Sequence, residues 1–267
     1  MDMQRIKRIC VGIFILGMCL GCVGLEFYTY QSKETLSSEH EGAYVVSGAV
    51  IENKQKKEEK EKKVAYLTFD DGPSKVTERV LDVLKVYEVN ATFFLIGSNI
   101  TEETEGLVKR MVEEGNVIGI HTYSHEANEM YSSVENYKKD FQKAEEAIES
   151  LVKIDSRLCR FPWGSVNNYL SGIEGEILPW LEQKEYTYCD WNVSGEDAVG
   201  TPTNWSIYHN VQKDFGRYKQ PVILLHDGGT CQLTADVLPD IIAMLKEAGY
   251  SFDTLDHMES PYQFSKN

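Results

Sequence analysis

The sequence predicts an α/β domain built on a parallel sheet, and two observations carry that prediction. From Val64 onward, short apolar runs alternate with longer segments of helical periodicity, which is typical of βα units in a parallel sheet. Several runs end in charged or polar residues, as strands do in α/β enzymes that place their chemistry at the carboxyl edge of the sheet. Seven such runs favour a small or incomplete barrel, although the pattern alone leaves a doubly wound open sheet as an alternative.

Residues 1–28 are predicted to be a signal-anchor or a signal segment. Arg5, Lys7 and Arg8 precede 17 uncharged residues, Ile9 to Leu25, a length that suits a short membrane-spanning helix or a signal peptide. The basic flank favours a cytoplasmic N-terminus and an extracytoplasmic remainder. Since no A-x-A cleavage site follows, we prefer an uncleaved anchor. The protein is therefore expected to be membrane-anchored or secreted, with the membrane bound through this segment.

Residues 29–63 are predicted to be a polar linker that ends in a run of lysines and glutamates, Lys54 to Lys63. Such a tract buries too little apolar surface to fold alone. Residues 64–260 are expected to form the folded domain. Residues 64–267 hold 17 basic and 33 acidic side chains, a balance of −16. Nucleic acid is therefore a poor partner, because binding it relies on neutralising phosphates.

The elements of the domain are expected in strict alternation, with Gly115 and Gly249 where helix ends are predicted. The strands are Val64–Phe69, Ala91–Leu95, Val117–His121, Leu158–Phe161, Tyr186–Asp190, Pro221–His226 and Ser251–Thr254. The helices are Val76–Tyr87, Thr104–Glu114, Val134–Val152, Glu174–Lys184, Asn204–Gly216 and Ala235–Ala248. Cys159, Cys189 and Cys231 are expected to be buried thiols, with one bridge between the first two as the alternative if their strands adjoin.

Asp70 and Asp71 close the first strand, where burying two carboxylates is costly unless a metal or another cation compensates. One could hold a metal while the other moves a proton; an Asp-Gly turn that solvates its own charges is the alternative. His121 and His125 close the third strand and face the same way if the segment turns helically. One carboxylate with two histidines is a common open site for Zn²⁺ or a similar divalent ion.

Two further strand ends carry polar residues. Arg160 lies near the end of the fourth strand and needs an anionic partner, for which Asp70 is available. His226 ends another strand and can serve as a general acid if a carboxylate raises its pKa; the candidates are Asp190, Glu196 and Asp197. A structural histidine and a simple Pro-Gly turn with Trp163 in the core are the alternatives. Four polar strand ends on one rim favour an active site.

These residues resemble the carbohydrate esterase family 4 polysaccharide deacetylases. Thr68 to Pro73 matches the motif TFDDGP, and His121 to His125 matches H-[ST]-x-x-H. Arg160 to Gly164 resembles R-x-P-[YW], and Leu224 to His226 matches L-x-H. The resemblance covers most of residues 64–256 and implies a distorted (β/α)₇ barrel.

By this resemblance, Asp71, His121 and His125 would hold one divalent metal ion, with Zn²⁺ expected first and Co, Mn or Ni as alternatives. Asp70 would be the base that activates water, oriented by Arg160. His226 would protonate the departing amine, Leu224 would line the acetyl pocket and the backbone N–H of Trp163 would help bind the oxyanion. The full set of expected substrate contacts is Pro162, Trp163, Trp191 and Leu224.

The fourth motif departs from the family pattern D-x-x-D-W. Asp197 falls where the second Asp of that pattern belongs, but Ala198 replaces the Trp, and Trp191 lies six residues before Asp197. We assign the tuning of His226 to Asp197 and keep Asp190 as the alternative. Because this Trp is missing, the motif does not predict which residue forms that wall of the pocket, and so does not predict the substrate.

The predicted function is metal-dependent hydrolysis of N-acetyl groups from amino sugars of a cell-wall glycan, with peptidoglycan expected first and acetate released. Amide hydrolysis needs an activated water, oxyanion stabilisation and a proton for the leaving amine, and the candidate residues supply all three. The alternatives are a deacylase of chitooligosaccharides, small amides or O-acetyl esters, and a catalytically silent, tethered glycan-binding protein. A monomer is expected.

Overall fold

The computed structural model describes residues 62–265, all within one compact unit of the chain. The predicted signal-anchor and nearly all of the predicted linker lie outside the described residues. Within the described part, no helix has the length and apolar character needed to cross a membrane.

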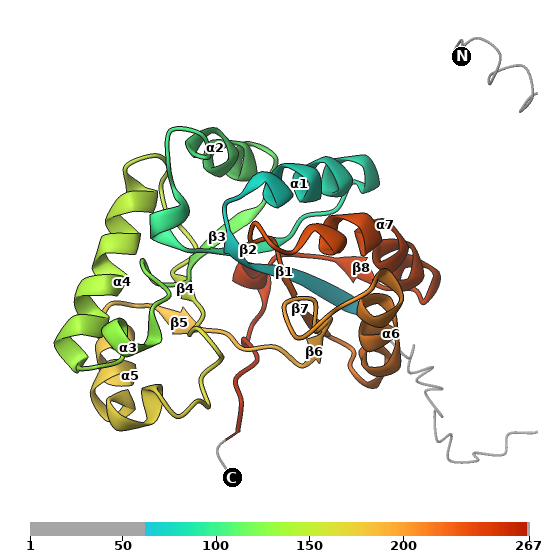
Figure 1. Ribbon diagram of the computed structural model, residues 1–267. Helices are drawn as coiled ribbons and strands as arrows, with labels where there is room; N and C mark the ends of the chain where they lie inside the picture. The colour runs from blue at the N-terminus through green and yellow to red at the C-terminus, as the bar shows by residue number, and fades with distance from the viewer. Residues whose placement is uncertain (1–61, 266–267) are drawn as a thin grey trace, which may run out of the picture. The chain divides into compact units, whose positions relative to one another are not determined.

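Eight strands form a single parallel sheet in the order β5-β4-β3-β2-β1-β7-β6, with β8 paired to the start of β1. The edge strands β5 and β6 follow each other in the chain, and the sheet curls so that helices cover its outside (Figure 1). The predicted α/β fold with an incomplete (β/α)₇ barrel is therefore confirmed. The strands are β1 (Val64–Gly72), β2 (Thr92–Leu95), β3 (Val117–Ile120), β4 (Leu158–Cys159), β5 (Thr187–Tyr188), β6 (Val193–Ser194), β7 (Val222–His226) and β8 (Ser251–Phe252).

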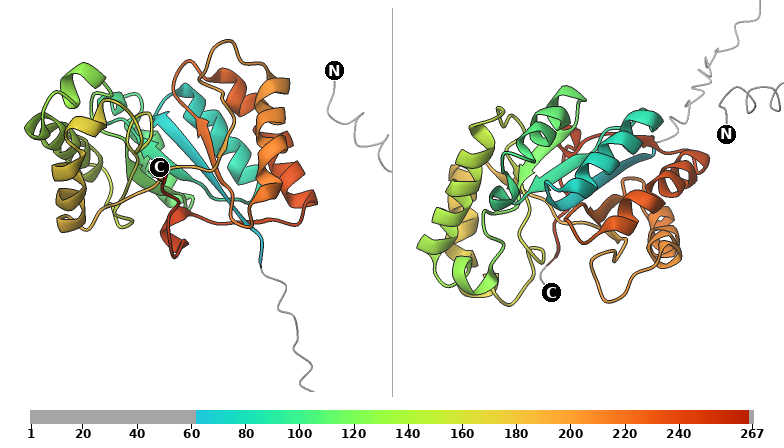
Figure 2. Two further views of the ribbon diagram at one scale, coloured as in Figure 1. Left: turned by 90° about the horizontal axis from the view of Figure 1, so that it is seen from below. Right: turned by 45° about the horizontal axis from the view of Figure 1, so that its top comes forward.

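The helices alternate with these strands, and Figure 2 shows α1 packed beside α7, and α7 beside α6. They are α1 (Lys75–Tyr87), α2 (Glu105–Glu113), α3 (Ala127–Met130), α4 (Val134–Glu149), α5 (Glu174–Gln183), α6 (Asn204–Asp214) and α7 (Gln232–Glu247). Short 3₁₀ turns are η1 (Gly97–Asn99), η2 (Leu170–Gly172), η3 (Phe215–Arg217) and η4 (Leu255–His257). All seven predicted strands and six predicted helices are present, and the structure adds β6, of two residues, and α3, of four, which the sequence pattern does not predict.

The central strand β1 separates two hydrophobic clusters because successive side chains of a strand face opposite sides. Leu67 and Phe69 belong to the large outer core beneath the helices. Val64 and Tyr66 belong to a smaller inner cluster, which the C-terminal segment joins through Leu255. Continuing the alternation brings Thr68 and Asp70 to the inner face. The three domain cysteines, Cys159, Cys189 and Cys231, are buried free thiols, as expected.

Candidate active site

A β-bulge at the end of β1 lets two adjacent aspartates face the same site. In a regular strand, Asp70 and Asp71 would point to opposite faces of the sheet. The pairing with β2 shifts register between Asp70 and Gly72, and Asp71 has φ +73°. Asp tolerates this left-handed region better than most residues. The amide of Asn99 donates to the Asp71 carbonyl at 2.8 Å and fixes the bulge.

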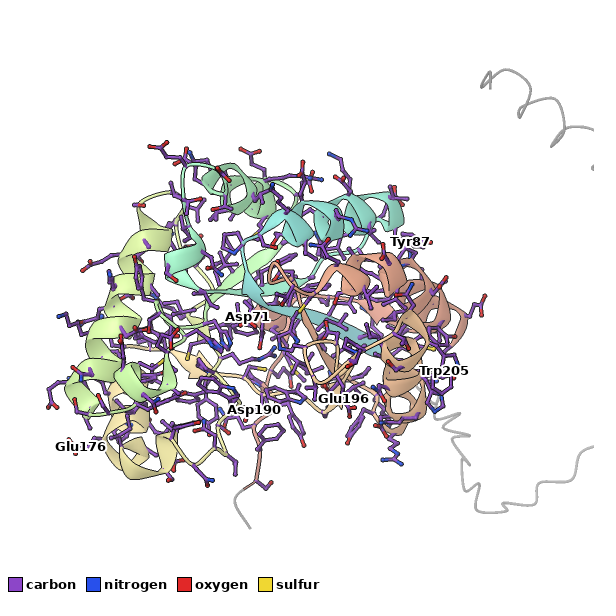
Figure 3. The ribbon with its side chains drawn as sticks, viewed as in Figure 1. Asp71, Tyr87, Glu176, Asp190, Glu196 and Trp205 are labelled. Carbon is purple, nitrogen blue, oxygen red and sulfur yellow. The ribbon has the colours of Figure 1, made fainter. Side chains whose placement is uncertain are left out.

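Three metal-ligating groups converge at this bulge. The ligand atoms of Asp71, His121 and His125 all lie within 4.8 Å of one another, and Asp71 Oδ1 is 3.5 Å from Nε2 of each histidine. His121 Nδ1 lies 2.8 Å from the Arg160 carbonyl. A carbonyl only accepts, so Nδ1 of His121 carries the proton and its Nε2 presents a lone pair. Figure 3 shows Asp71 in the middle of the domain, well away from Trp205 on α6.

This donor set fits a divalent ion. Asp71 Oδ1 is buried and has no hydrogen-bond partner among the described residues, although two ring nitrogens are near. Burial and the neighbouring His121 lower the pKa of His125, which favours the neutral, ligating form. Ligand atoms about 2.1 Å from one tetrahedral ion lie roughly 3.4 Å apart. The spacing around Asp71 therefore matches a shared cation better than direct hydrogen bonds.

Asp70 lies beside the cluster with one oxygen held and the other free to act. Arg160 donates to Asp70 Oδ1 at 2.8 Å, while Oδ2 lies 3.8 Å from His121 Nε2. Arg160 is fully enclosed and also donates to the Thr68 hydroxyl and to the carbonyls of Cys189 and Asp190. The two backbone carbonyls hold the guanidinium in place. The guanidinium in turn fixes the carboxylate of Asp70.

His226 pairs with Asp197 across the rim from the metal-ligating cluster. β1 and β7 place Asp70 and His226 opposite each other in register. His226 Nδ1 lies 2.8 Å from Asp197 Oδ1, whose other oxygen accepts from the His226 backbone N–H and the Thr234 hydroxyl. Burial lowers the pKa of His226, but the hydrogen bond and charge of Asp197 outweigh it and, with Asp70 and Asp71, raise the pKa to about 9. At neutral pH the ring is charged, and Nε2 holds a proton to donate.

Asp190, the alternative partner for His226, forms its hydrogen bonds with other residues. Its carboxylate accepts from the backbone N–H and hydroxyl of Ser165 at 2.8 and 2.5 Å, and from the N–H of Phe264 at 2.8 Å. Asp190 thereby ties the loop after β4 to the C-terminal segment. Sequence spacing had left both aspartates open, and the structure pairs His226 with Asp197.

The expected substrate-contact residues lie at different depths. Trp163 has 47% of its surface exposed, and its ring centroid lies 4.7 Å from that of His125. Leu224 is buried on β7, and the Pro162 carbonyl accepts from the Tyr131 hydroxyl. Trp191 is partly buried, packs against the inner cluster and meets Phe264 edge-on. Trp163 and Leu224 are thus near the polar rim, whereas Trp191 covers the inner cluster.

Sequence reasoning missed several residues that shape this site. Thr234, on the buried face of α7, gives a third hydrogen bond to Asp197. Tyr169 is half exposed beside Trp163, with ring centroids 5.4 Å apart. Asp140 on α4 accepts from the backbone of the loop that carries His125. None belongs to a motif, and all three come from elements that no spacing rule connects to the rim.

Comparisons with known proteins found a matching family model and similar named proteins. Residues 57–176 match the family model described as polysaccharide deacetylase. A peptidoglycan-N-acetylglucosamine deacetylase of Bacillus cereus is 33% identical over 212 residues, which cover 76% of this chain and 72% of that protein.

Solved structures show the same fold. The catalytic domain of a peptidoglycan N-acetylglucosamine deacetylase from Eubacterium rectale superposes with a TM-score of 0.70 at 31% identity, covering 76% of this chain and 93% of that one. A family 4 acetyl xylan esterase from Clostridium thermocellum, solved with a cobalt ion, gives a TM-score of 0.60 at 29% identity, covering 72% and 88%.

Proposed function

This chain belongs to the polysaccharide deacetylase family, and we propose that it hydrolyses N-acetyl groups on amino sugars of peptidoglycan, releasing acetate. One observation carries the proposal. A metal-ligating cluster of Asp71, His121 and His125 lies beside a fixed carboxylate, Asp70, and the pairing of β1 with β7 places a charged histidine, His226, opposite Asp70. The relatives named as peptidoglycan deacetylases support the choice of polymer. An apolar segment with a basic flank, Arg5 to Leu25, supports a tether that keeps the domain outside the membrane, next to the wall.

A divalent ion, for which we propose Zn²⁺, would polarise the acetyl carbonyl and lower the pKa of water at the site. Asp70 Oδ2 then removes a proton from the attacking water, while Arg160 fixes the other oxygen and prevents the carboxylate from turning away. The described part of the chain contains every proposed catalytic residue, so the proposed reaction needs no second copy to complete the site, and we propose that the protein acts as a monomer.

His226 completes the reaction by protonating the amine as the C–N bond breaks. Its raised pKa, maintained by Asp197, keeps the ring charged at neutral pH. The Trp163 backbone N–H forms no hydrogen bond within the described residues, and we assign it to the oxyanion. Each proton-transfer group typically supplies about 10²–10⁴-fold of the rate.

The experiment is acetate release from purified peptidoglycan, chitooligosaccharides and acetylated xylan, with Zn²⁺ or after chelation. The proposal expects the fastest metal-dependent release from peptidoglycan. Asp70→Asn and His226→Ala should each lower turnover by about 10²-fold or more and still bind Zn²⁺, because neither side chain is a proposed ligand. Release from xylan alone would instead indicate an O-acetyl esterase. Glycan binding without release from any substrate would indicate a silent binding protein.

A further inference from the structure

The two histidines of the cluster are held in different ways. His121 follows β3 directly, and its Nδ1 bonds to the Arg160 carbonyl at 2.8 Å. His125 lies four residues further along, and among the described residues the one aromatic side chain from another element that contacts its ring is Trp163, tilted against it with ring centroids 4.7 Å apart. The position of its Nε2 therefore depends on the backbone between the two histidines, the loop 122–125.

That loop has an unfavourable backbone. Thr122 has φ +68° and His125 has φ +57°. Left-handed conformations cost free energy for residues with a Cβ, and a β-branched residue such as Thr suffers most. Something outside the loop must hold it in this shape.

Asp140 is the side chain that does so. From α4 its Oδ1 accepts from the backbone N–H of Tyr123 at 2.6 Å and of Ser124 at 3.2 Å, and its Oδ2 also lies 3.2 Å from the Ser124 N–H. On the other side, the carbonyls of Thr122 and Tyr123 accept from the backbone of η1 at 3.0 and 2.9 Å. A substitution would leave the backbone donors of η1 in place, whereas a single substitution removes the carboxylate of Asp140.

We propose that Asp140 is a positioning residue for the metal site, which acts through the loop 122–125 to keep His125 Nε2 aimed at Asp71 Oδ1. The inference rests on the metal ligands of the proposed function. Charge-assisted bonds from a carboxylate to two N–H groups are about twice as strong as neutral ones. Residues that orient metal ligands typically change metal affinity by about 10–100-fold when removed.

The test measures Zn²⁺ affinity of the purified protein by competition with a chromophoric chelator, without any glycan. Asp140→Ala should weaken Zn²⁺ binding by about tenfold or more. Asp140→Asn keeps one accepting oxygen and should fall between Ala and wild type. Acetate release by Asp140→Ala should recover when Zn²⁺ is raised, which a general packing defect would not produce.

The matched control is Asp214→Ala, which removes a helical, half-buried Asp of α6 that pairs with Arg217 at 3.0 Å. It should leave Zn²⁺ affinity within twofold of wild type. The proposal is overturned if folded Asp140→Ala or Asp140→Asn binds Zn²⁺ as tightly as wild type, or if Asp214→Ala loses the same affinity. Because Zn²⁺ binding needs no substrate, this result is independent of whether peptidoglycan is deacetylated.

Discussion

The hydrogen bond and charge of Asp197 contribute most to the raised pKa of His226, so one substitution should move the pH profile of the enzyme. Burial lowers the pKa of His226, but Asp197, with Asp70 and Asp71, raises it to about 9, so the proposed general acid loses its proton only above that pH. In Asp197→Asn the pKa should fall toward or below about 6.5, the ordinary value. The protonated fraction at pH 8 then drops roughly 30-fold, and kcat/KM measured against pH should show its alkaline limb at lower pH.

The free energy of unfolding should also depend on pH through His226. A histidine whose folded pKa is raised contributes free energy of unfolding that is complete below its unfolded pKa and lost as pH rises through about 9. Asp253→Asn is the control, because it breaks an exposed pair with His257, at 2.7 Å, far from the rim. An alkaline limb that stays near pH 9 in Asp197→Asn would contradict the assignment of His226 as the acid.

Tyr169 and Trp163 form an exposed aromatic surface beside His125. Tyr169 is 50% exposed and stacks on buried Tyr131 with an angle of 9° between the rings. Exposed apolar patches next to a site mark ligand contacts, and sugar rings present apolar C–H faces that aromatic rings can cover. We expect this surface to bind a sugar next to the one that reacts.

Tyr169→Ala should therefore raise KM for oligomeric glycans by about fivefold, on the scale of ~1 kcal/mol for an aromatic contact. kcat should change little, since binding is lost equally in ground and transition states. The measurement is steady-state acetate release from glycans of different chain length. The difference in KM between Tyr169→Ala and wild type should disappear for the shortest substrate. Trp205→Ala, which removes a 71% exposed Trp on α6, should leave KM unchanged. An equal rise in KM there would refute sugar binding by the aromatic surface of Tyr169 and Trp163.

At the scale of elements, the turn from β1 to α1 is tied to the end of β7. The buried Asp227 carboxyl accepts from the Thr77 hydroxyl, and its carbonyl accepts from the N-cap residue Ser74 at 2.6 Å. A Cβ at Gly72 would lie 2.5 Å from Asp227 Oδ2. The turn that carries Asp70 and Asp71 therefore needs a residue without a side chain at this position.

Gly72→Ala should destabilise the fold by about 1–3 kcal/mol, the usual cost of overpacking. Gly106→Ala is the matched control, because Gly106 lies in α2, where an added Cβ would meet nothing within 4 Å, and the variant should gain about 0.5–1 kcal/mol from helix propensity. Denaturant-induced unfolding measures both. Equal stability of the two variants would show that Asp227 moves aside freely.

The same elements show how far sequence reasoning reaches. The apolar run at Val64–Phe69 predicts β1, but a run that is apolar at nearly every position does not reveal which face of the sheet Asp70 lies on. The direction of Asp71 depends on a bulge with positive φ, which an Asp-Asp-Gly sequence permits without requiring. Asp140 is one acid among several in α4, so only the packing of α4 against the loop 122–125 distinguishes it.

At the scale of the whole molecule, the candidate metal site joins side chains that lie far apart in the sequence and meet only in the folded domain. Asp71 lies near the end of β1, and His121 and His125 follow β3, with β2 between these strands in the sheet. A ligand that binds only the folded state stabilises it by mass action. Metal binding should therefore raise the stability of the entire domain and not only of the rim.

Adding Zn²⁺ to metal-free protein at about 100 times its Kd should stabilise the fold by about 2.7 kcal/mol, or roughly 5–10 °C in Tm for a domain of this size. The measurement is thermal unfolding followed by circular dichroism. His125→Ala should lose most of this shift, whereas Asp70→Asn should keep it because Asp70 is not a proposed ligand. His257→Ala removes an exposed histidine of η4 and should behave as wild type. A full shift in His125→Ala would show that Zn²⁺ binds elsewhere, and the buried thiols would then be the next candidates.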